Sequence, residues 1–200
     1  MTGFVVRHLP STGYLEQRWR NGGGSTREIA RHPDGADHWL WRLSIARVES
    51  DGPFSSFPGI DRHLLLLSGN GLRLRFDDGT LQVLMPPHGA LRFAGDEAVH
   101  GELIDGPVTD FNLMWRRDRV TADVWLRPLV GSGVLAVAAG ETWAMHLVAG
   151  RLRLGDGAAT GLASGDTAMV RNDVEATHLL RYDGSGTAIV VRIRPAVQSG

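Results

Sequence analysis

The sequence predicts an all-β protein. In its 200 residues, 26 glycines and nine prolines separate short apolar runs such as 64–67, 81–85 and 188–191. Short runs bounded by turn residues are typical of the strands of a sandwich or barrel. Helical periodicity is scarce, and a short helical turn is expected only within 11–18. We therefore expect helix to be a minor component.

The stretch 19–28 reads Trp-Arg-Asn-Gly-Gly-Gly-Ser-Thr-Arg-Glu. Three consecutive glycines are tolerated where a side chain would collide, so the backbone here is expected to pass close to another group. An ordinary tight turn explains the same pattern. A phosphate-binding loop does not, because the chain contains no lysine.

Three predicted strands in the first half carry polar side chains on one face. Successive side chains of a strand point to opposite faces, so residues two apart lie together. If these faces line a cup, they supply hydrogen-bond donors and acceptors for a small polar ligand; a solvent-facing sheet surface is the alternative. The polar positions are Thr26 and Glu28, then Arg42 and Ser44, then Asp110 and Asn112, with Met114 and Arg116 on the same face.

The segment 51–62 contains two glycines, two prolines and two phenylalanines. Such a composition predicts an ordered loop that delivers Asp61 and Arg62 to a fixed place. A pair of surface charges at the start of a strand is the alternative.

A weak internal repeat predicts two similar β modules. A jelly-roll or cupin barrel, which packs two antiparallel sheets, fits such a doubled arrangement. The charged run 116–119 marks the boundary, so we expect modules at 1–120 and 121–200. The paired segments are 71–79 with 150–157, 98–106 with 176–184, and 111–117 with 188–194, which makes His100 and His178 equivalent.

Composition limits the partners and the chemistry. The formal net charge is −1, with 42% hydrophobic and 22% charged residues, which gives no support for nucleic-acid or membrane binding. The absence of cysteine excludes disulfides, thiolate metal sites and cysteine nucleophiles. The amino terminus lacks a basic segment followed by an apolar core, so we expect no signal peptide and a cytoplasmic location.

No metal, cofactor or catalytic residue is predicted. None of the eight histidines forms a His-x-His pair, although folding could bring distant ones together. No Gly-x-Ser-x-Gly elbow is present for nucleophilic catalysis.

The first half of the chain resembles the HutD/Ves family of small bacterial proteins. The resemblance rests on 19–28, on Arg42-Leu43-Ser44, on 52–62 and on 110–114; the second half matches only in β character. It implies a bicupin fold, made of two cupin-like jelly-roll β-barrel modules, and a link to histidine utilisation. Members are thought to bind a pathway intermediate such as N-formylglutamate or urocanate and to restrain flux.

The residues and the resemblance together predict a site for a small acidic metabolite in the first module. Arginine binds carboxylates through paired N–H groups, amides and hydroxyls add neutral hydrogen bonds, and Trp19 would form a wall. The predicted ligand-binding residues are Trp19, Asn21, Gly22, Gly23, Gly24, Thr26, Glu28, Arg42, Ser44, Asp61, Arg62, Asp110 and Asn112.

We therefore expect a non-catalytic small-molecule-binding protein that modulates histidine utilisation. The alternative is a cupin enzyme, either a metal-dependent oxygenase or isomerase or a hydrolase of formyl compounds. A protein-interaction module without a ligand is a third hypothesis. The sequence leaves a homodimer open.

Overall fold

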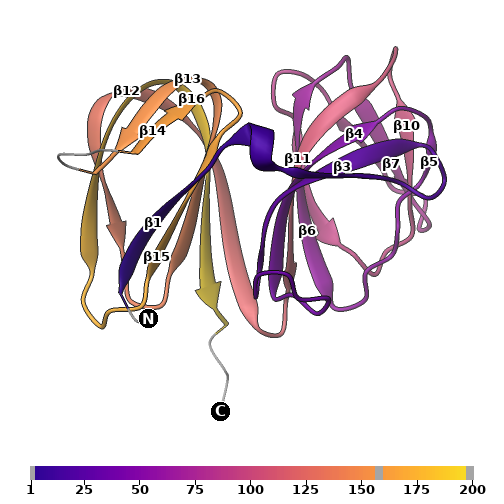
Figure 1. Cartoon of the computed structure of the whole chain (residues 1–200). Coiled ribbons are helices and arrows are strands. Elements are labelled where there is room, and N and C mark those ends of the chain that lie inside the picture. Colours follow the sequence, from indigo (N-terminus) through magenta and orange to yellow (C-terminus); the bar gives the residue numbers. More distant parts are fainter. Residues whose placement is uncertain (1–2, 156–159, 197–200) are drawn as a thin grey trace. The chain divides into compact units, whose positions relative to one another are not determined.

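The computed structural model describes residues 3–155 and 160–196, and these are built almost entirely from antiparallel strands (Figure 1). The all-β prediction is confirmed; the one helical element among the described residues is the 3₁₀ turn η1 (Ser11–Gly13). The chain divides into two compact units. One is Leu15–Arg119, and the other combines Met1–Tyr14 with Val120–Gly200.

The unit Leu15–Arg119 contains two sheets. Six strands follow the order β2-β3-β4-β11-β6-β9, and four follow the order β5-β10-β7-β8. Their bounds are β2 Leu15–Arg18, β3 Gly24–His32, β4 Trp41–Val48, β5 Gly52–Pro53, β6 Ile60–Ser68, β7 Leu72–Phe76, β8 Leu81–Leu84, β9 Ala90–Ala94, β10 Val99–Leu103 and β11 Val108–Arg116.

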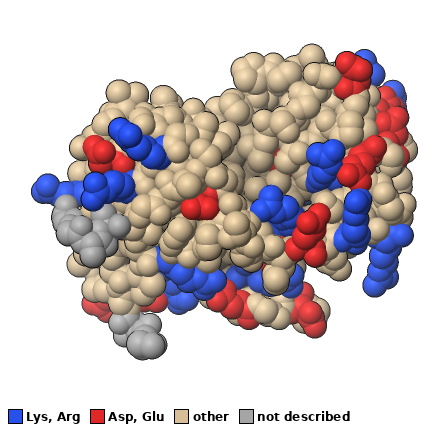
Figure 2. Space-filling model, turned by 45° about the horizontal axis from the view of Figure 1, so that its top comes forward, with Lys and Arg blue, Asp and Glu red and all other residues tan. Residues whose placement is uncertain are grey.

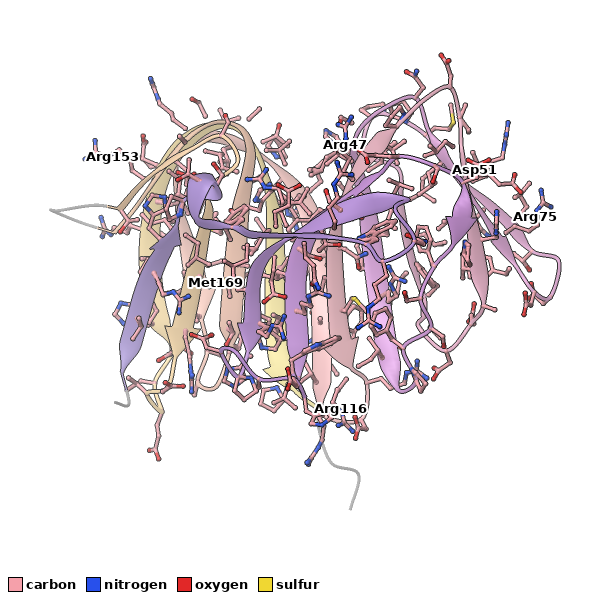
Figure 3. The ribbon with its side chains drawn as sticks, turned by 45° about the vertical axis from the view of Figure 1, so that its right-hand side comes forward. Arg47, Asp51, Arg75, Arg116, Arg153 and Met169 are labelled. Carbon is pink, nitrogen blue, oxygen red and sulfur yellow. The ribbon has the colours of Figure 1, made fainter. Side chains whose placement is uncertain are left out.

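The core of this unit lies between its two sheets. Along β7, Leu72 and Leu74 are buried whereas Arg73 and Arg75 are exposed, the alternation expected of a strand with one face on the core. Arg75 projects outward from the unit in Figure 3. Residues of both sheets share one apolar cluster, which includes Val48, Leu64, Leu66, Leu72, Leu74, Phe76, Leu84, Phe93, Val99 and Val108.

The other unit is a single sheet with the order β1-β15-β13-β16-β12, to which β14 adds by pairing with β13. Strands β12 and β16 pair along their whole length of 18 residues each. The bounds are β1 Phe4–Leu9, β12 Val120–Val137, β13 Thr142–Leu154, β14 Thr160–Ala163, β15 Thr167–Asn172 and β16 His178–Pro195.

The first strand joins the unit that contains Val120–Gly200, whereas the expected boundary near residue 120 puts residues 1–14 in the first module. Strand β1 pairs with β15 from Phe4↔Asn172 to Leu9↔Thr167. The following turn is also tied there, because the hydroxyl of Tyr14 donates to the carbonyl of Gly165 at 2.8 Å. Strand pairing between segments so distant in the sequence leaves no local signature, so sequence patterns could not reveal it.

The short helical turn expected within 11–18 is the 3₁₀ turn Ser11–Gly13, and Leu15–Arg18 is strand β2. One expectation differs from the structure: among the described strands, the predicted barrels are not closed by hydrogen bonds, because every sheet ends in edge strands. In Leu15–Arg119 the sheets meet through apolar side chains instead of a continuous backbone ladder.

The charged surface mixes both signs. Arginines and acidic residues alternate over the face in Figure 2, and many are paired, as in the Arg75–Glu102 bridge at 2.9 Å. Such exposed pairs contribute little to stability. The described part of the chain contains no helix with the length and apolar character needed to cross a bilayer.

Candidate ligand-binding site

A cavity of about 470 Å³ lies within the unit Leu15–Arg119. One face of the six-stranded sheet supplies most of its polar wall, and the turn before β3 and the loop after β5 supply the rest. The lining residues are Gln17, Arg18, Trp19, Arg20, Asn21, Thr26, Arg42, Ser44, Ala46, Val48, Pro53, Phe54, Ser55, Phe57, Arg62, Asp110, Asn112 and Met114.

The polar faces predicted from alternation meet at this cavity. Asn112 of β11 lies opposite Ser44 of β4, and Thr26 of β3 lies opposite Ala46 of β4. Because the three strands are neighbours in register, their like-facing positions form one continuous surface. Figure 1 labels these three strands, β3, β4 and β11.

The triple glycine forms the turn between β2 and β3. A Cβ on Gly24 would lie 2.1 Å from the carbonyl oxygen of Arg47, and 3.0 Å from the ring of Trp19. The close approach predicted from the glycines is therefore an approach to β4 and to Trp19. The indole Nε1–H of Trp19 donates to Thr26 Oγ1 at 2.8 Å, which leaves the hydroxyl hydrogen of Thr26 available to another acceptor.

Arg62 lies at the wall of the cavity among three phenylalanine rings. Its guanidinium carbon is 5.2 Å from the ring centre of Phe54, 5.8 Å from that of Phe57 and 5.1 Å from that of Phe93. Burial lowers the pKa of Arg62 to about 10, with the charge of Asp110 acting in the opposite direction. Its Nε is buried and has no hydrogen-bond partner among the described residues.

Asp110 and Asn112 add two further unsatisfied atoms. Asp110 is 1% exposed and Asn112 is 5% exposed, and the Oδ1 atom of each is buried without a partner in the described part of the chain. Burial raises the pKa of Asp110 to about 7, although the positive charge of Arg62 lowers it in part. Buried polar atoms without partners are costly and rare, so three in one cavity mark it as a candidate site for a polar ligand.

Arg42 is held in place by Glu28. The Nε–H of Arg42 donates to Glu28 Oε2 at 2.8 Å, and the Nε–H of Arg31 donates to Glu28 Oε1 at 2.6 Å. Burial would raise the pKa of Glu28, but hydrogen bonds and charges from the two arginines outweigh it and lower the pKa. A register shift between Glu28 and Ala30 marks a β-bulge at this point, a feature that re-aims side chains.

Eight of the thirteen predicted residues line the cavity and five do not. Gly22, Gly23 and Gly24 shape the turn, and Glu28 acts behind Arg42. Asp61 points away because it neighbours Arg62 on a strand, and it pairs with Arg92 at 2.7 Å and Arg117 at 2.8 Å. The eight that line it are Trp19, Asn21, Thr26, Arg42, Ser44, Arg62, Asp110 and Asn112.

Ten lining residues were not predicted to bind ligand. Ala46 and Val48 could have been found by extending the alternation of β4, and Met114 already lay on the polar face. The contact of Phe54 and Phe57 with Arg62 has no sequence signal. The ten are Gln17, Arg18, Arg20, Ala46, Val48, Pro53, Phe54, Ser55, Phe57 and Met114.

Within 3–155 and 160–196, histidines and acidic residues do not gather in groups of three that could hold a metal ion. The expectation of a metal-free site therefore stays a prediction.

The HutD family model matches residues 11–190. The chain belongs to the HutD family. Among its HutD relatives, an uncharacterized 21.2 kDa protein in the hutC 3′ region of Pseudomonas putida is 40% identical over 115 residues, which are 57% of this chain and 60% of that protein. Protein Ves of Cronobacter sakazakii is 44% identical over 125 residues, which are 62% of this chain and 65% of that protein. The chain thus spans less than two thirds of the length of the curated relatives it matches.

Solved structures support the same assignment. HutD from Pseudomonas fluorescens SBW25, in a formate condition, has 29% sequence identity and a TM-score of 0.83, covering 96% of this chain and all of that one. A likeness to the bacterial pirin YhhW from Escherichia coli, at 10% identity and a TM-score of 0.69 over 96% of this chain and all of that one, shows the fold alone. The fold of this HutD protein is all-β and cupin-like.

Proposed function

We propose that this HutD protein is a non-catalytic binder of a small acidic metabolite of histidine degradation, such as N-formylglutamate or urocanate, and that it modulates histidine utilisation. The observation that carries the proposal is the buried Nε–H of Arg62, which has no acceptor in the described part of the chain and lies in a cavity that also holds Arg42. Guanidinium groups form their strongest hydrogen bonds with carboxylates. The carboxylate of an acidic ligand would accept a hydrogen bond from this Nε–H.

The neutral groups of the cavity suit the rest of such a ligand. Asn112 offers a buried amide, and the hydroxyl hydrogen of Thr26 is left available by Trp19. Metabolites with a carboxylate and a formyl or imidazole group need such mixed contacts. The HutD structure in a formate condition supports a one-carbon carboxylate as the smallest probe.

We further propose that the two units are related cupin-like modules, as expected for a bicupin. Strand β11 lies between β4 and β6, and β10 lies between β5 and β7; in the other unit the two halves of β16 both lie between β12 and β13. Strands β8 and β9 correspond in the same way to β14 and β15. One long strand thus takes the place of two shorter ones.

This correspondence supports a ligand site in the unit Leu15–Arg119. Asn112 lies between Ser44 and Leu64, and its counterpart Val190 lies between Trp125 and Met145. This register is one residue away from the pairing of 111–117 with 188–194 expected from the sequence. By the same register, Ala188 and Trp143 take the places of Asp110 and Arg62. The ligand-facing polar groups of one unit are therefore matched by apolar side chains in the other, where Trp143 stacks on Trp125 with ring centres 6.0 Å apart.

A second candidate is a hydrolase of formyl compounds, favoured by the pKa of about 7 at the carboxyl of Asp110 in the cavity. A carboxylate with a pKa near the working pH is suited to general base catalysis. Asp110 would take a proton from water, the water oxygen would attack the formyl carbon, and the C–N bond would break. The departing amine would take up the proton, so that formate and the free amino acid are the products.

Thermal-shift measurements with N-formylglutamate, urocanate, formate and glutamate test the binding proposal. A ligand that binds only the folded state raises the melting temperature. Arg62→Ala should abolish the shift, whereas Arg153→Ala, which removes an exposed arginine outside the cavity, should leave it unchanged. No shift with any compound at millimolar concentration would refute the ligand assignment. Release of formate from N-formylglutamate would instead support the hydrolase.

A further inference from the structure

The carboxyl group of Asp110 lies in a position where a carboxylate ligand would meet a second negative charge. Asp110 lines the cavity together with Arg62 and Arg42, and among the described residues no other acidic side chain lines it. We propose that the site binds its carboxylate ligand together with one proton, held on Asp110, which then donates a hydrogen bond to the ligand. This inference rests on the proposed binding function and adds the proton as a second component of recognition.

The charged groups around Asp110 are few. Strand β6 contributes Arg62, β4 contributes Arg42 held by Glu28 of β3, and the segment before β3 contributes Arg18 and Arg20 at the cavity wall. The residues of β5 and the loop after it that line the cavity carry no titratable group, being Pro53, Phe54, Ser55 and Phe57.

The neighbours of Asp110 across the sheet are apolar. Ala46 of β4 and Leu66 of β6 lie opposite it. Among the described residues, no arginine forms an ion pair with the Asp110 carboxylate within 4.0 Å. The Oδ1 atom of Asp110 also has no hydrogen-bond partner among them. The carboxyl group is therefore desolvated, and the charge of Arg62 compensates only part of that cost.

The hydrogen-bonding groups in the cavity require a proton on Asp110 when a carboxylate binds. A ligand carboxylate only accepts hydrogen bonds, which suits the Nε–H of Arg62 but conflicts with an ionised Asp110 in the same cavity. Two carboxylates that share a buried site retain one proton between them. Once protonated, Asp110 changes from an acceptor into a donor. It can then donate a hydrogen bond to the ligand carboxylate instead of repelling it. A neutral ligand would not drive this change.

The ligand-free protein is already poised for this step. Burial raises the pKa of Asp110 to about 7, so the carboxyl is about half protonated at neutral pH. A bound carboxylate takes the counter-charge of Arg62 and adds its own negative charge, and both effects raise the pKa further. Binding therefore takes up a proton and weakens as the pH rises.

Isothermal titration of the full chain with formate and with N-formylglutamate tests the inference. Measurements at pH 7 in two buffers of different ionisation enthalpy should reveal uptake of about half a proton per ligand, and the dissociation constant should rise about tenfold from pH 6 to pH 8. Formamide, a neutral analogue of formate, should bind without proton uptake and with the same affinity at both pH values.

The variant Asp110→Asn tests whether Asp110 is the group that takes up the proton when the ligand binds. Its dissociation constant for formate should change less than twofold from pH 6 to pH 8, because the carboxamide donates at every pH. If this variant does not fold, the ¹³C carboxyl resonance of Asp110 in the wild-type protein, titrated with and without formate, gives the same answer by the shift of its midpoint to higher pH.

Binding without proton uptake, or a midpoint that does not move, would overturn this inference and leave the binding function standing. If neither formate nor N-formylglutamate binds, both the inference and the proposed function fail.

Discussion

In the ligand-free protein, Asp110→Asn is expected to increase stability at alkaline pH. The carboxyl is fully buried, and burial raises its pKa from 3.8 to about 7. A raised pKa means that the folded state binds more protons than the unfolded state between these values, so the wild-type protein loses stability as the pH rises from about 4 to about 7. The variant carries no ionisable group there and escapes the loss.

The size of the effect follows from the shift. About three pKa units at 1.36 kcal/mol each amount to about 4 kcal/mol over the whole range, of which about 3 kcal/mol falls between pH 5 and pH 8. Urea unfolding of wild type and Asp110→Asn at both pH values measures the difference directly. We expect the free energy of unfolding of the variant, relative to that of the wild type, to increase by about 3 kcal/mol from pH 5 to pH 8.

Asn112→Asp is the matched control. It places a carboxyl in the same cavity two residues along β11, with an equally buried position. This variant should lose stability relative to the wild type over the same pH range. Equal stability differences at pH 5 and pH 8 for Asp110→Asn would show that burial of this carboxylate carries no net cost, contrary to its raised pKa.

Three other substitutions test other parts of the chain. Burial would raise the pKa of Asp166, but hydrogen bonds from Ser11 N–H, His8 and Ala163 N–H outweigh it and lower the pKa below 3.8. The stabilisation by its carboxylate is therefore present at neutral pH and is lost as the pH falls through the lowered pKa. Asp166→Asn should lower the melting temperature at pH 7, and the difference from the wild type should shrink steadily as the pH falls below 3.8. Gly24→Ala should cost about 1–3 kcal/mol in urea unfolding, because its Cβ would meet the carbonyl of Arg47, and a neutral result would contradict the close approach. Trp143→Ala should cost about 3–5 kcal/mol, since it removes a buried indole whose Nε1–H donates to Glu141 at 2.8 Å, and a loss below 1 kcal/mol would contradict that packing.

The strands and the orientation of their side chains could be predicted from the sequence. Alternation is a property of neighbouring residues, so the shared faces of Thr26 with Glu28, and of Asp110 with Asn112, needed no tertiary information. The family could also be recognised from the sequence, because the motif around Gly22 to Gly24 and the loop before Arg62 lie within continuous segments.

What the sequence could not supply were the partners of each group. Whether the carbonyl of Arg47 or a ligand lies beside Gly24, and whether Phe93 lies beside Arg62, depends on segments that are remote along the chain. The pairing of β1 with β15 is decided in the same way.

The sequence by itself therefore determined the all-β class, the family and the polar faces, since these follow from the order of neighbouring residues. Only the tertiary structure decided that Arg62, Asp110 and Asn112 are buried around one cavity with unsatisfied polar atoms. Burial and hydrogen-bond satisfaction are sums over all nearby atoms, and most of those atoms belong to distant parts of the chain.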